Sequence, residues 1–175
     1  MRALILAAGR GTRISRYLSG KPKCTVDIGN GLCLIWYTVE LLKSRGISEI
    51  GIVLGYRAQV IRDVLKDCSV KFYVNPFYDV TNSIASAWFA GSFVEEAAQA
   101  GEDLMIMNGD VYMEEALLDQ ILAEKKSPVM FADETRKETA PKYMVLKLGS
   151  PKDQFPLYSD FFSSSLLSVI ISVLL

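Results

Sequence analysis

Short apolar runs alternate with helical patterns along this chain, and this alternation limits the folds open to it. Strands are predicted at Arg2–Ala7, Glu49–Leu54, Val70–Val74, Asp103–Met107 and Pro128–Ala132. Helices are predicted near Leu34–Ser44, Ala58–Leu65, Ser83–Ala98 and Met113–Lys126. Strands that lack a polar face are typical of a parallel sheet covered by helices on both sides. The expected fold is a three-layer, doubly wound α/β fold with a mostly parallel sheet.

The balance of charges argues against polyanions as partners. Lys and Arg number 19 and Asp and Glu number 20 among 175 residues, so the net charge is -1. Neither nucleic acid nor a membrane surface is expected to bind such a chain through charge alone. Three cysteines without a Cys-x-x-Cys spacing favour a reducing, cytoplasmic location. The oligomeric state stays open, and a homo-oligomer is compatible with the sequence.

Histidine is absent from the chain. This absence excludes Ser-His and Cys-His nucleophile pairs, histidine general bases and zinc sites that need imidazole. Any chemistry must therefore use Asp, Glu, Lys, Arg, Tyr and backbone dipoles.

The pattern changes near residue 150. Residues 1–150 carry the alternation, with a further strand expected at Tyr143–Leu148, whereas residues 151–175 form an apolar, serine-rich tail. The uncharged stretch is shorter than the ~20 residues of a membrane-spanning helix. An edge strand, a partner-binding segment and an accidental terminus from a truncated reading frame are all open for this tail.

The first predicted strand ends in small residues that are followed by cations. Residues Leu6–Arg13 read Leu-Ala-Ala-Gly-Arg-Gly-Thr-Arg, and a Lys-Pro-Lys that ends at Lys23 follows. Without a Cβ, Gly9 and Gly11 let backbone N–H groups approach a phosphate closely, and Arg13 and Lys23 add positive charge. The sequence is not a Walker A loop, and it lacks the third glycine of the dinucleotide fingerprint. A lone Gly-x-Gly indicates only a turn, but the joint pattern predicts a phosphate-binding loop.

A carboxylate follows the fourth predicted strand. Asp103–Met107 runs into Asn-Gly-Asp, which ends at Asp110. The carboxyl ends of parallel strands share one edge of a sheet, so Asp110 is expected beside the loop after the first strand. Its carboxylate suits Mg²⁺ that bridges nucleotide phosphates. A turn without a ligand is the alternative, and the nearby phosphate loop favours the metal.

Leu-Ala-Ala-Gly-x-Gly-Thr-Arg followed by Pro-Lys resembles the signature of nucleotidyltransferases, among them the sugar-phosphate and phosphocholine nucleotidylyltransferases. The resemblance implies a Rossmann-like fold in which residues 6–13 wrap the base and triphosphate of an NTP. It also implies that Lys23 contacts the α-phosphate and that Asp110 holds Mg²⁺. Arg13 would then neutralise the leaving pyrophosphate.

Two later segments extend the resemblance. Val-Leu-Gly-Tyr, with Gly55 at its third position, follows the second strand, and Asn-Pro-Phe-Tyr leads to Thr-Asn-Ser-Ile-Ala-Ser-Ala-Trp. Asn82 and Ser83 are candidates for contact with the ligand, and a helix cap is the equally simple alternative for each. Trp88 is either a core residue or, with Tyr78, part of a box for a quaternary ammonium. The expected nucleotide-binding residues are Leu6, Ala7, Ala8, Gly9, Gly11, Thr12, Gly55, Asn82 and Ser83.

The resemblance implies transfer of an NMP unit from an NTP to a small phosphorylated acceptor, with release of pyrophosphate. The phosphocholine-like segment favours CTP, and phosphocholine or a sugar phosphate is the expected acceptor. The family supplies a second metal-binding acid from a later strand, for which this sequence has no evident counterpart. A nucleotide-binding or regulatory module without turnover is therefore the alternative.

Overall fold

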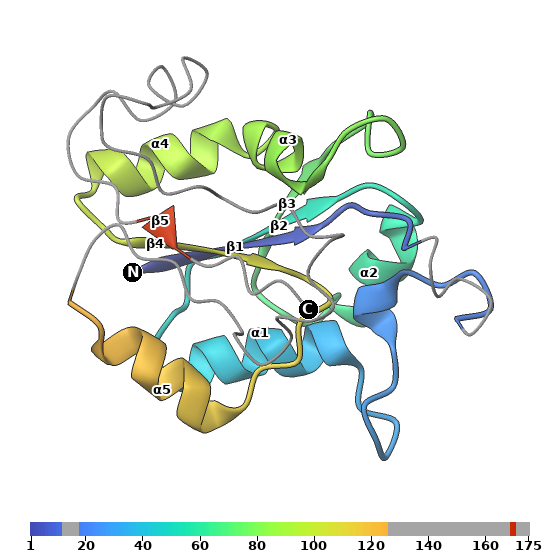
Figure 1. The fold of residues 1–175 in the computed structure, drawn as a ribbon, viewed down its shortest axis with the longest axis horizontal. Helices are drawn as coiled ribbons and strands as arrows, with labels where there is room; N and C mark the ends of the chain where they lie inside the picture. Colours follow the sequence, from blue (N-terminus) through green and yellow to red (C-terminus); the bar gives the residue numbers. More distant parts are fainter. Residues whose placement is uncertain (12–17, 126–168, 171–175) are drawn as a thin grey trace, which may run out of the picture.

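The computed structural model describes residues 1–11, 18–125 and 169–170. Its parallel sheet has the strand order β3-β2-β1-β4-β5, with β1 at the centre (Figure 1). The strands are β1 (Arg2–Ala7), β2 (Ile50–Leu54), β3 (Lys71–Val74), β4 (Leu104–Asn108) and β5 (Val169–Ile170). The chain runs outward from β1 through β2 to β3 and returns to add β4 on the other side of β1. This reversal creates a crevice beyond the carboxyl ends of β1 and β4, where ligands bind in such sheets.

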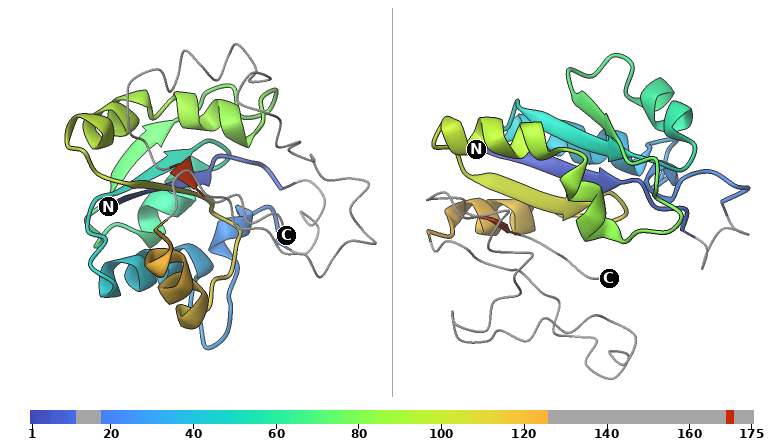
Figure 2. Two further views of the ribbon diagram at one scale, coloured as in Figure 1. Left: turned by 60° about the vertical axis from the view of Figure 1, so that its left-hand side comes forward. Right: turned by 90° about the horizontal axis from the view of Figure 1, so that it is seen from above.

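Helices cover both faces of the sheet, as Figures 1 and 2 show. On one face lie α1 (Leu34–Ser44), α2 (Ala58–Val64) and α5 (Glu115–Ala123), and on the other lie α3 (Ser83–Trp88) and α4 (Gly91–Gln99). The first face buries Ile5 and Ile52 with these helices, and the second buries Leu4 and Val53 against Phe93. Adjacent residues of one strand are thus buried on opposite faces, which explains why the strands lack a polar side. The predicted three-layer, doubly wound α/β fold is confirmed.

The helix predicted over Ser83–Ala98 is in fact two helices. The backbone leaves helical geometry at Ala90, whose φ and ψ are -106° and 24°, and α4 begins at Gly91. Glycine weakens a helix interior by about 1 kcal/mol relative to alanine, so the chain bends there at low cost. The bend lets α4 pack Phe93 onto the sheet while α3 starts close to the strand ends.

The other predicted boundaries differ by small amounts. The strands β2, β3 and β4 each begin one residue later than predicted, and α5 is shorter at both ends. The predicted strands at Pro128–Ala132 and Tyr143–Leu148 lie outside the described residues. In the terminal segment, Val169 and Ile170 pair with β4 in parallel. None of the helices within the described ranges has the length and apolar character needed to cross a membrane.

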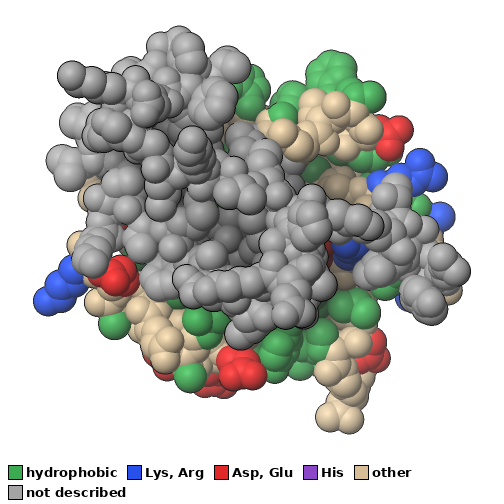
Figure 3. All heavy atoms as spheres, in the orientation of Figure 1, with side chains coloured by type: hydrophobic (Ala, Val, Ile, Leu, Met, Phe, Trp, Pro, Cys, Tyr) green, Lys and Arg blue, Asp and Glu red, His purple; other side chains and the backbone are tan. Residues whose placement is uncertain are grey.

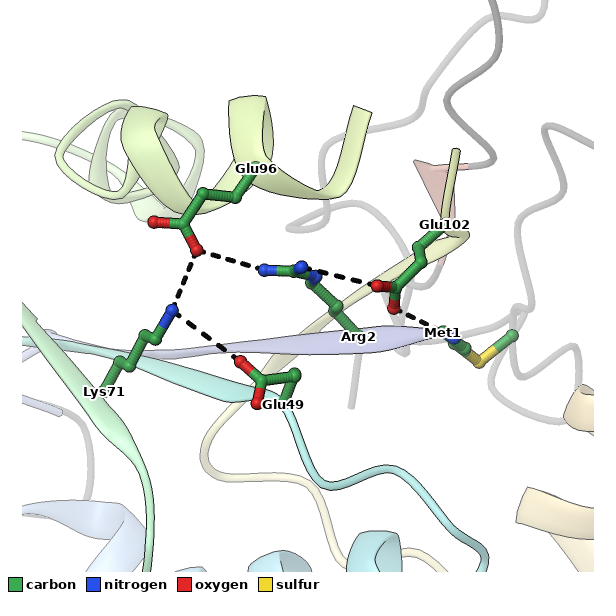
Figure 4. Close-up of polar contacts among 6 residues, drawn as sticks. All are labelled: Met1, Arg2, Glu49, Lys71, Glu96 and Glu102. Carbon is green, nitrogen blue, oxygen red and sulfur yellow. Dashed lines mark hydrogen bonds and ion pairs between the residues drawn. The ribbon is translucent and has the colours of Figure 1, made fainter. Parts of the chain in front are cut away.

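Charged side chains at the amino end of the sheet pair with one another (Figure 4). The Arg2 guanidinium lies 3.1 Å from Glu96 and 3.3 Å from Glu102. The Lys71 ammonium lies 2.8 Å from Glu96 and 3.7 Å from Glu49. These ion pairs join β1, β3 and α4 at the edge remote from the β1/β4 crevice, so their role is structural.

Candidate active site

Three loops meet at the carboxyl end of β1. The Gly109 N–H donates to the Leu6 carbonyl at 2.9 Å, and the Tyr56 N–H donates to the Ala8 carbonyl at 2.9 Å. Both contacts need glycine nearby. A Cβ built on Gly55 would lie 2.6 Å from the Ala8 oxygen, and one on Gly109 would lie 3.0 Å from the Ala7 Cβ. The loops after β1, β2 and β4 are therefore fixed together at the crevice.

Lys23 and Asp110 face each other across this crevice. The Lys23 Nζ donates to the Asp110 Oδ2 at 3.4 Å, with 22% of the lysine and 45% of the aspartate side chain exposed. Lys23 opens the 3-10 helix η2 (Lys23–Thr25), which Thr25 fixes by donating from Oγ1 to the Pro22 carbonyl at 2.7 Å. The structure thus brings together the predicted cation and the predicted carboxylate, and solvent reaches both.

Gly11 lies directly against the Lys23 side chain. A Cβ built on Gly11 would be 2.5 Å from the Lys23 Cγ, and the φ of Gly11 is +66°, in the left-handed region that favours glycine. Gly9 is exposed, and no described atom lies within 4 Å of a Cβ built on it. The glycine turn is therefore open to solvent next to Lys23. Thr12 and Arg13 lie outside the described residues.

The thiol beside Lys23 is not a nucleophile. Burial, together with the charges of Cys33 and Asp110, raises the pKa of Cys24 to about 12. Burial also raises the pKa of Cys33. Both thiols are protonated at neutral pH, so neither competes with a bound substrate for an electrophilic phosphorus.

Asn75 organises the segment between β3 and α3. Its side chain is wholly buried, donates to the Thr81 and Ser86 hydroxyl oxygens at 3.0 Å each, and accepts from the Phe77 N–H at 2.8 Å. Sequence reasoning gave Asn75 no role, although an asparagine before a proline at the end of a strand is a turn signal. Asn75 therefore holds the turn that delivers α3 to the crevice side of the sheet.

Asn82 caps α3, as one of its two predicted interpretations requires. Its Oδ1 accepts from the Ala85 N–H at 3.0 Å. Ser83 is the first residue of α3, and its side chain lies outside the described set. Contact of either residue with a ligand stays a prediction. Trp88 is not a core residue, because 66% of its surface is exposed, while Tyr78 packs against Tyr56 with ring centroids 6.3 Å apart.

Sequence reasoning also missed Tyr37, which supports the loop that carries Asp110. Its hydroxyl donates to the Met113 carbonyl at 2.9 Å, and its ring stacks on Tyr112 at 5.4 Å. A tyrosine in the first turn of an amphipathic helix carries no signal for such a contact. Tyr37 extends from α1, so one helix supports the loop after β4.

The donors present suit a magnesium ion only together with a nucleotide. Asp110 offers one half-exposed carboxylate, and within the described ranges no group of three His, Cys, Asp or Glu side chains could hold a metal. Magnesium is commonly bound by one or two carboxylates plus substrate phosphates and water. Asp110 with phosphate oxygens meets that requirement.

Lys and Arg side chains also gather on the side of the molecule toward which the strands run (Figure 3).

Comparisons with known proteins identify relatives that are cytidylyltransferases by name. The chain is 32% identical over 136 residues to the CTP:phosphoglutamine cytidylyltransferase of Campylobacter jejuni, which covers 77% of this chain and 53% of that protein. It is 34% identical over 102 residues to the choline-phosphate cytidylyltransferase of Streptococcus pneumoniae, covering 55% of this chain and 44% of that protein. A solved structure of the CTP:phosphocholine cytidylyltransferase of Streptococcus pneumoniae superposes with a TM-score of 0.54 at 31% identity, covering 62% of this chain and 44% of that one.

The chain spans about half the length of these relatives. Residues 3–169 match the MobA-like NTP transferase domain. The resemblance of the glycine loop and the Pro-Lys to nucleotidyltransferases is confirmed by these matches. The chain therefore belongs to the family of MobA-like NTP transferase domains.

Proposed function

We propose that this protein transfers an NMP unit from an NTP to a small phosphorylated acceptor and releases pyrophosphate. The observation that carries the proposal is the Lys23–Asp110 pair beside the open Gly9–Gly11 turn, at the crevice where the strand order reverses. Backbone N–H groups, one ammonium and one carboxylate are the groups that a magnesium triphosphate needs.

In the proposed reaction, an oxygen of the acceptor phosphate attacks the α-phosphorus in line. The new P–O bond forms as the bond to the β-phosphate oxygen breaks, and pyrophosphate leaves with the electron pair. A phosphate monoester has a second pKa near ~6, so the attacking group is largely dianionic at neutral pH. The reaction therefore needs neither a protein nucleophile nor a strong general base, in keeping with a chain that lacks histidine.

The side chains act by alignment and charge neutralisation. Lys23 would contact the α-phosphate, where negative charge is redistributed in the transition state, and Arg13 would contact the departing pyrophosphate. Asp110 would hold Mg²⁺ on phosphate oxygens, and the ion would neutralise their charge. In the free protein Lys23 and Asp110 neutralise each other. Binding of the magnesium nucleotide would thus replace the Lys23–Asp110 ion pair by two others, one between Lys23 and the α-phosphate and one between Asp110 and Mg²⁺.

CTP is the proposed nucleotide, because the phosphoglutamine and choline-phosphate relatives described above are cytidylyltransferases by name. Phosphocholine and a sugar phosphate remain the proposed acceptor classes. The Asn75 turn and the capped α3 bring the segment that resembles the phosphocholine-type enzymes to the crevice side of the sheet.

A second candidate is a nucleotide-binding module without turnover. The observation that favours it is the acid content of the site, since among the described residues no group of three His, Cys, Asp or Glu side chains could hold a metal. Such a module would bind a magnesium nucleotide through the same loop and would leave the α-phosphorus intact.

One experiment separates the two candidates. Each of the four NTPs is combined with Mg²⁺ and with phosphocholine, glucose 1-phosphate or phosphoglutamine, and pyrophosphate release is measured. Calorimetry on the same protein measures the affinity for each NTP. Release that needs both CTP and an acceptor supports the transferase, whereas tight binding without release supports the module. Failure to bind any NTP contradicts both.

A further inference from the structure

Tyr56 contacts the connection that carries the glycine turn at two places: the outgoing limb, which begins at Ala8, and the returning limb, which contains Gly20. Its backbone N–H donates to the Ala8 carbonyl at 2.9 Å, where the chain leaves β1. Its hydroxyl donates to the Gly20 carbonyl at 3.0 Å, where the chain returns toward η2. A single residue of the β2–α2 loop therefore links two points that are separated by eleven residues of chain.

The returning limb leads directly into Lys23. A turn closes where the Lys21 N–H donates to the Leu18 carbonyl at 2.8 Å, and Leu18 is buried. Gly20 has a φ of +74°, and Pro22 follows as the residue before η2. Gly20 is three residues before Lys23. The position of the Gly20 backbone therefore affects where the Lys23 side chain starts and whether its ammonium contacts Asp110.

The outgoing limb, which leads into the glycine turn, also lies near the Tyr56 ring. The Arg10 guanidinium lies 5.6 Å from the centroid of the Tyr56 ring, and the Arg57 guanidinium lies 5.8 Å from it. Tyr78 packs against the ring at 6.3 Å. The ring therefore contacts residues of three segments, and its hydroxyl points to the Gly20 carbonyl.

Both limbs must keep a fixed separation for the site to work. Gly11 is close enough to the Lys23 side chain that a Cβ would overlap it, so a small displacement of either limb changes the space between them. A phosphate that accepts from the Gly9–Gly11 backbone and from Lys23 at once needs that space to be constant.

We propose that Tyr56 is a positioning residue that holds the two limbs of the glycine loop at the separation required by a bound nucleoside triphosphate. The proposal rests on the proposed nucleotide site and assigns to Tyr56 the preorganisation of that site. Tyr56 touches the loop and not the reacting phosphorus, so its effect is on nucleotide affinity more than on the chemical step.

The test is Tyr56→Phe, which removes the hydroxyl and keeps both the ring and the backbone donor. Tyr73→Phe is the matched control, because Tyr73 lies on β3 and its ring packs against Phe93. Calorimetry with Mg²⁺ measures the Kd of whichever NTP the wild-type protein binds best. Kinetics measure the KM for that NTP and for the acceptor, and thermal melting measures stability.

Loss of one hydrogen bond that acts only in the organised loop should raise the nucleotide Kd and KM about fivefold in Tyr56→Phe. The acceptor KM and the Tyr73→Phe values should stay within about twofold of wild type. An unchanged nucleotide Kd in Tyr56→Phe overturns the inference, and a lower melting temperature with unchanged Kd assigns Tyr56 a purely structural role. Nucleotide binding by wild type without pyrophosphate release contradicts the proposed function alone. No binding of any NTP by wild type overturns both.

Discussion

The Nζ of Lys23 lies 3.4 Å from the Oδ2 of Asp110, although the two residues are 87 positions apart in the chain. The contact joins the loop after β1 to the loop after β4, on the two sides of the point where the strand order reverses. Neither side chain is buried, so the pair contributes little to stability. An exposed ion pair at the proposed nucleotide site is available for exchange with a charged substrate.

Replacement of Lys23 by alanine should lower kcat about 100-fold or more, because the proposed contact with the α-phosphate in the transition state would be lost. The nucleotide Kd should change only a few-fold, because the backbone of the glycine turn and Arg13 remain. Pyrophosphate release and calorimetry measure the two effects. Lys21→Ala is the matched control and should keep wild-type turnover. A Lys23→Ala enzyme with near-normal kcat would remove Lys23 from the mechanism.

Replacement of Gly11 by alanine should lower the free energy of unfolding by about 1–2 kcal/mol, since a non-glycine residue at positive φ is strained. The new Cβ would also displace the Lys23 side chain, so turnover should fall with stability. Gly9→Ala should change the free energy of unfolding by less than about 0.5 kcal/mol, as expected for an open surface position. Urea unfolding of both variants measures the difference. Equal stability losses would contradict the described loop geometry.

Replacement of Asn75 by alanine should cost about 3 kcal/mol of stability. The Phe77 N–H would lose its acceptor, and an unsatisfied buried group costs about 1–3 kcal/mol. The Ser86 and Thr81 hydroxyl oxygens would each lose a donor and keep only the bonds that they donate to the Asn82 and Phe77 carbonyls. Asn82→Ala removes a helix cap and should cost only about 1 kcal/mol. Chemical denaturation compares the two variants. If Asn82→Ala also weakens acceptor or nucleotide binding, Asn82 contacts the ligand as well as capping α3.

Cys24 makes stability depend on alkaline pH. The thiol has a pKa near 9 in the unfolded chain and about 12 in the folded protein, because burial disfavours the thiolate. Between these values the unfolded state has lost a proton that the folded state keeps. The free energy of unfolding should therefore decrease as pH rises from about 9 toward 12, by about 1.4 kcal/mol per pH unit for this group.

Cys24→Ala isolates this effect, because the lysines and tyrosines that titrate in the same range are shared by both proteins. Urea unfolding at pH 8, 9.5 and 10.5, values chosen to bracket the thiol pKa of about 9 in the unfolded chain, should give a shallower decline for the variant. Identical declines in both proteins would show that the thiol is as easily ionised in the folded as in the unfolded state.

The layers and the site edge were predictable because they follow from continuous sequence patterns. The strand β1 has the predicted bounds, and α1 ends as predicted before Gly46, whose φ of +80° a glycine adopts without strain. The carboxyl ends of parallel strands share one edge of the sheet, and this rule was enough to predict that Asp110 lies near the loop that follows β1. By contrast, no periodic pattern in the sequence predicts that the helix is interrupted at Ala90, which is buried in the same core as Phe93.

The supporting residues were not predictable for a similar reason. Tyr56 and Tyr37 act through hydrogen bonds to backbone groups that are distant in the chain. Asn75 occupies a position that signals a turn, but its contacts with the Thr81 and Ser86 hydroxyls depend on where α3 lies. Such contacts depend on the final positions of two loops, whereas a sequence pattern describes one segment at a time. The sequence left Trp88 either in the core or in an aromatic box with Tyr78, and the structure excludes the core.

A crystal structure of the protein with CTP and Mg²⁺ would show the proposed nucleotide site itself. We expect the triphosphate to lie between the Gly9–Gly11 backbone and Asp110, with the Lys23 ammonium moved from the carboxylate to an oxygen of the α-phosphate. A nucleotide bound elsewhere, or a Lys23–Asp110 pair that stays intact beside a bound triphosphate, would contradict it.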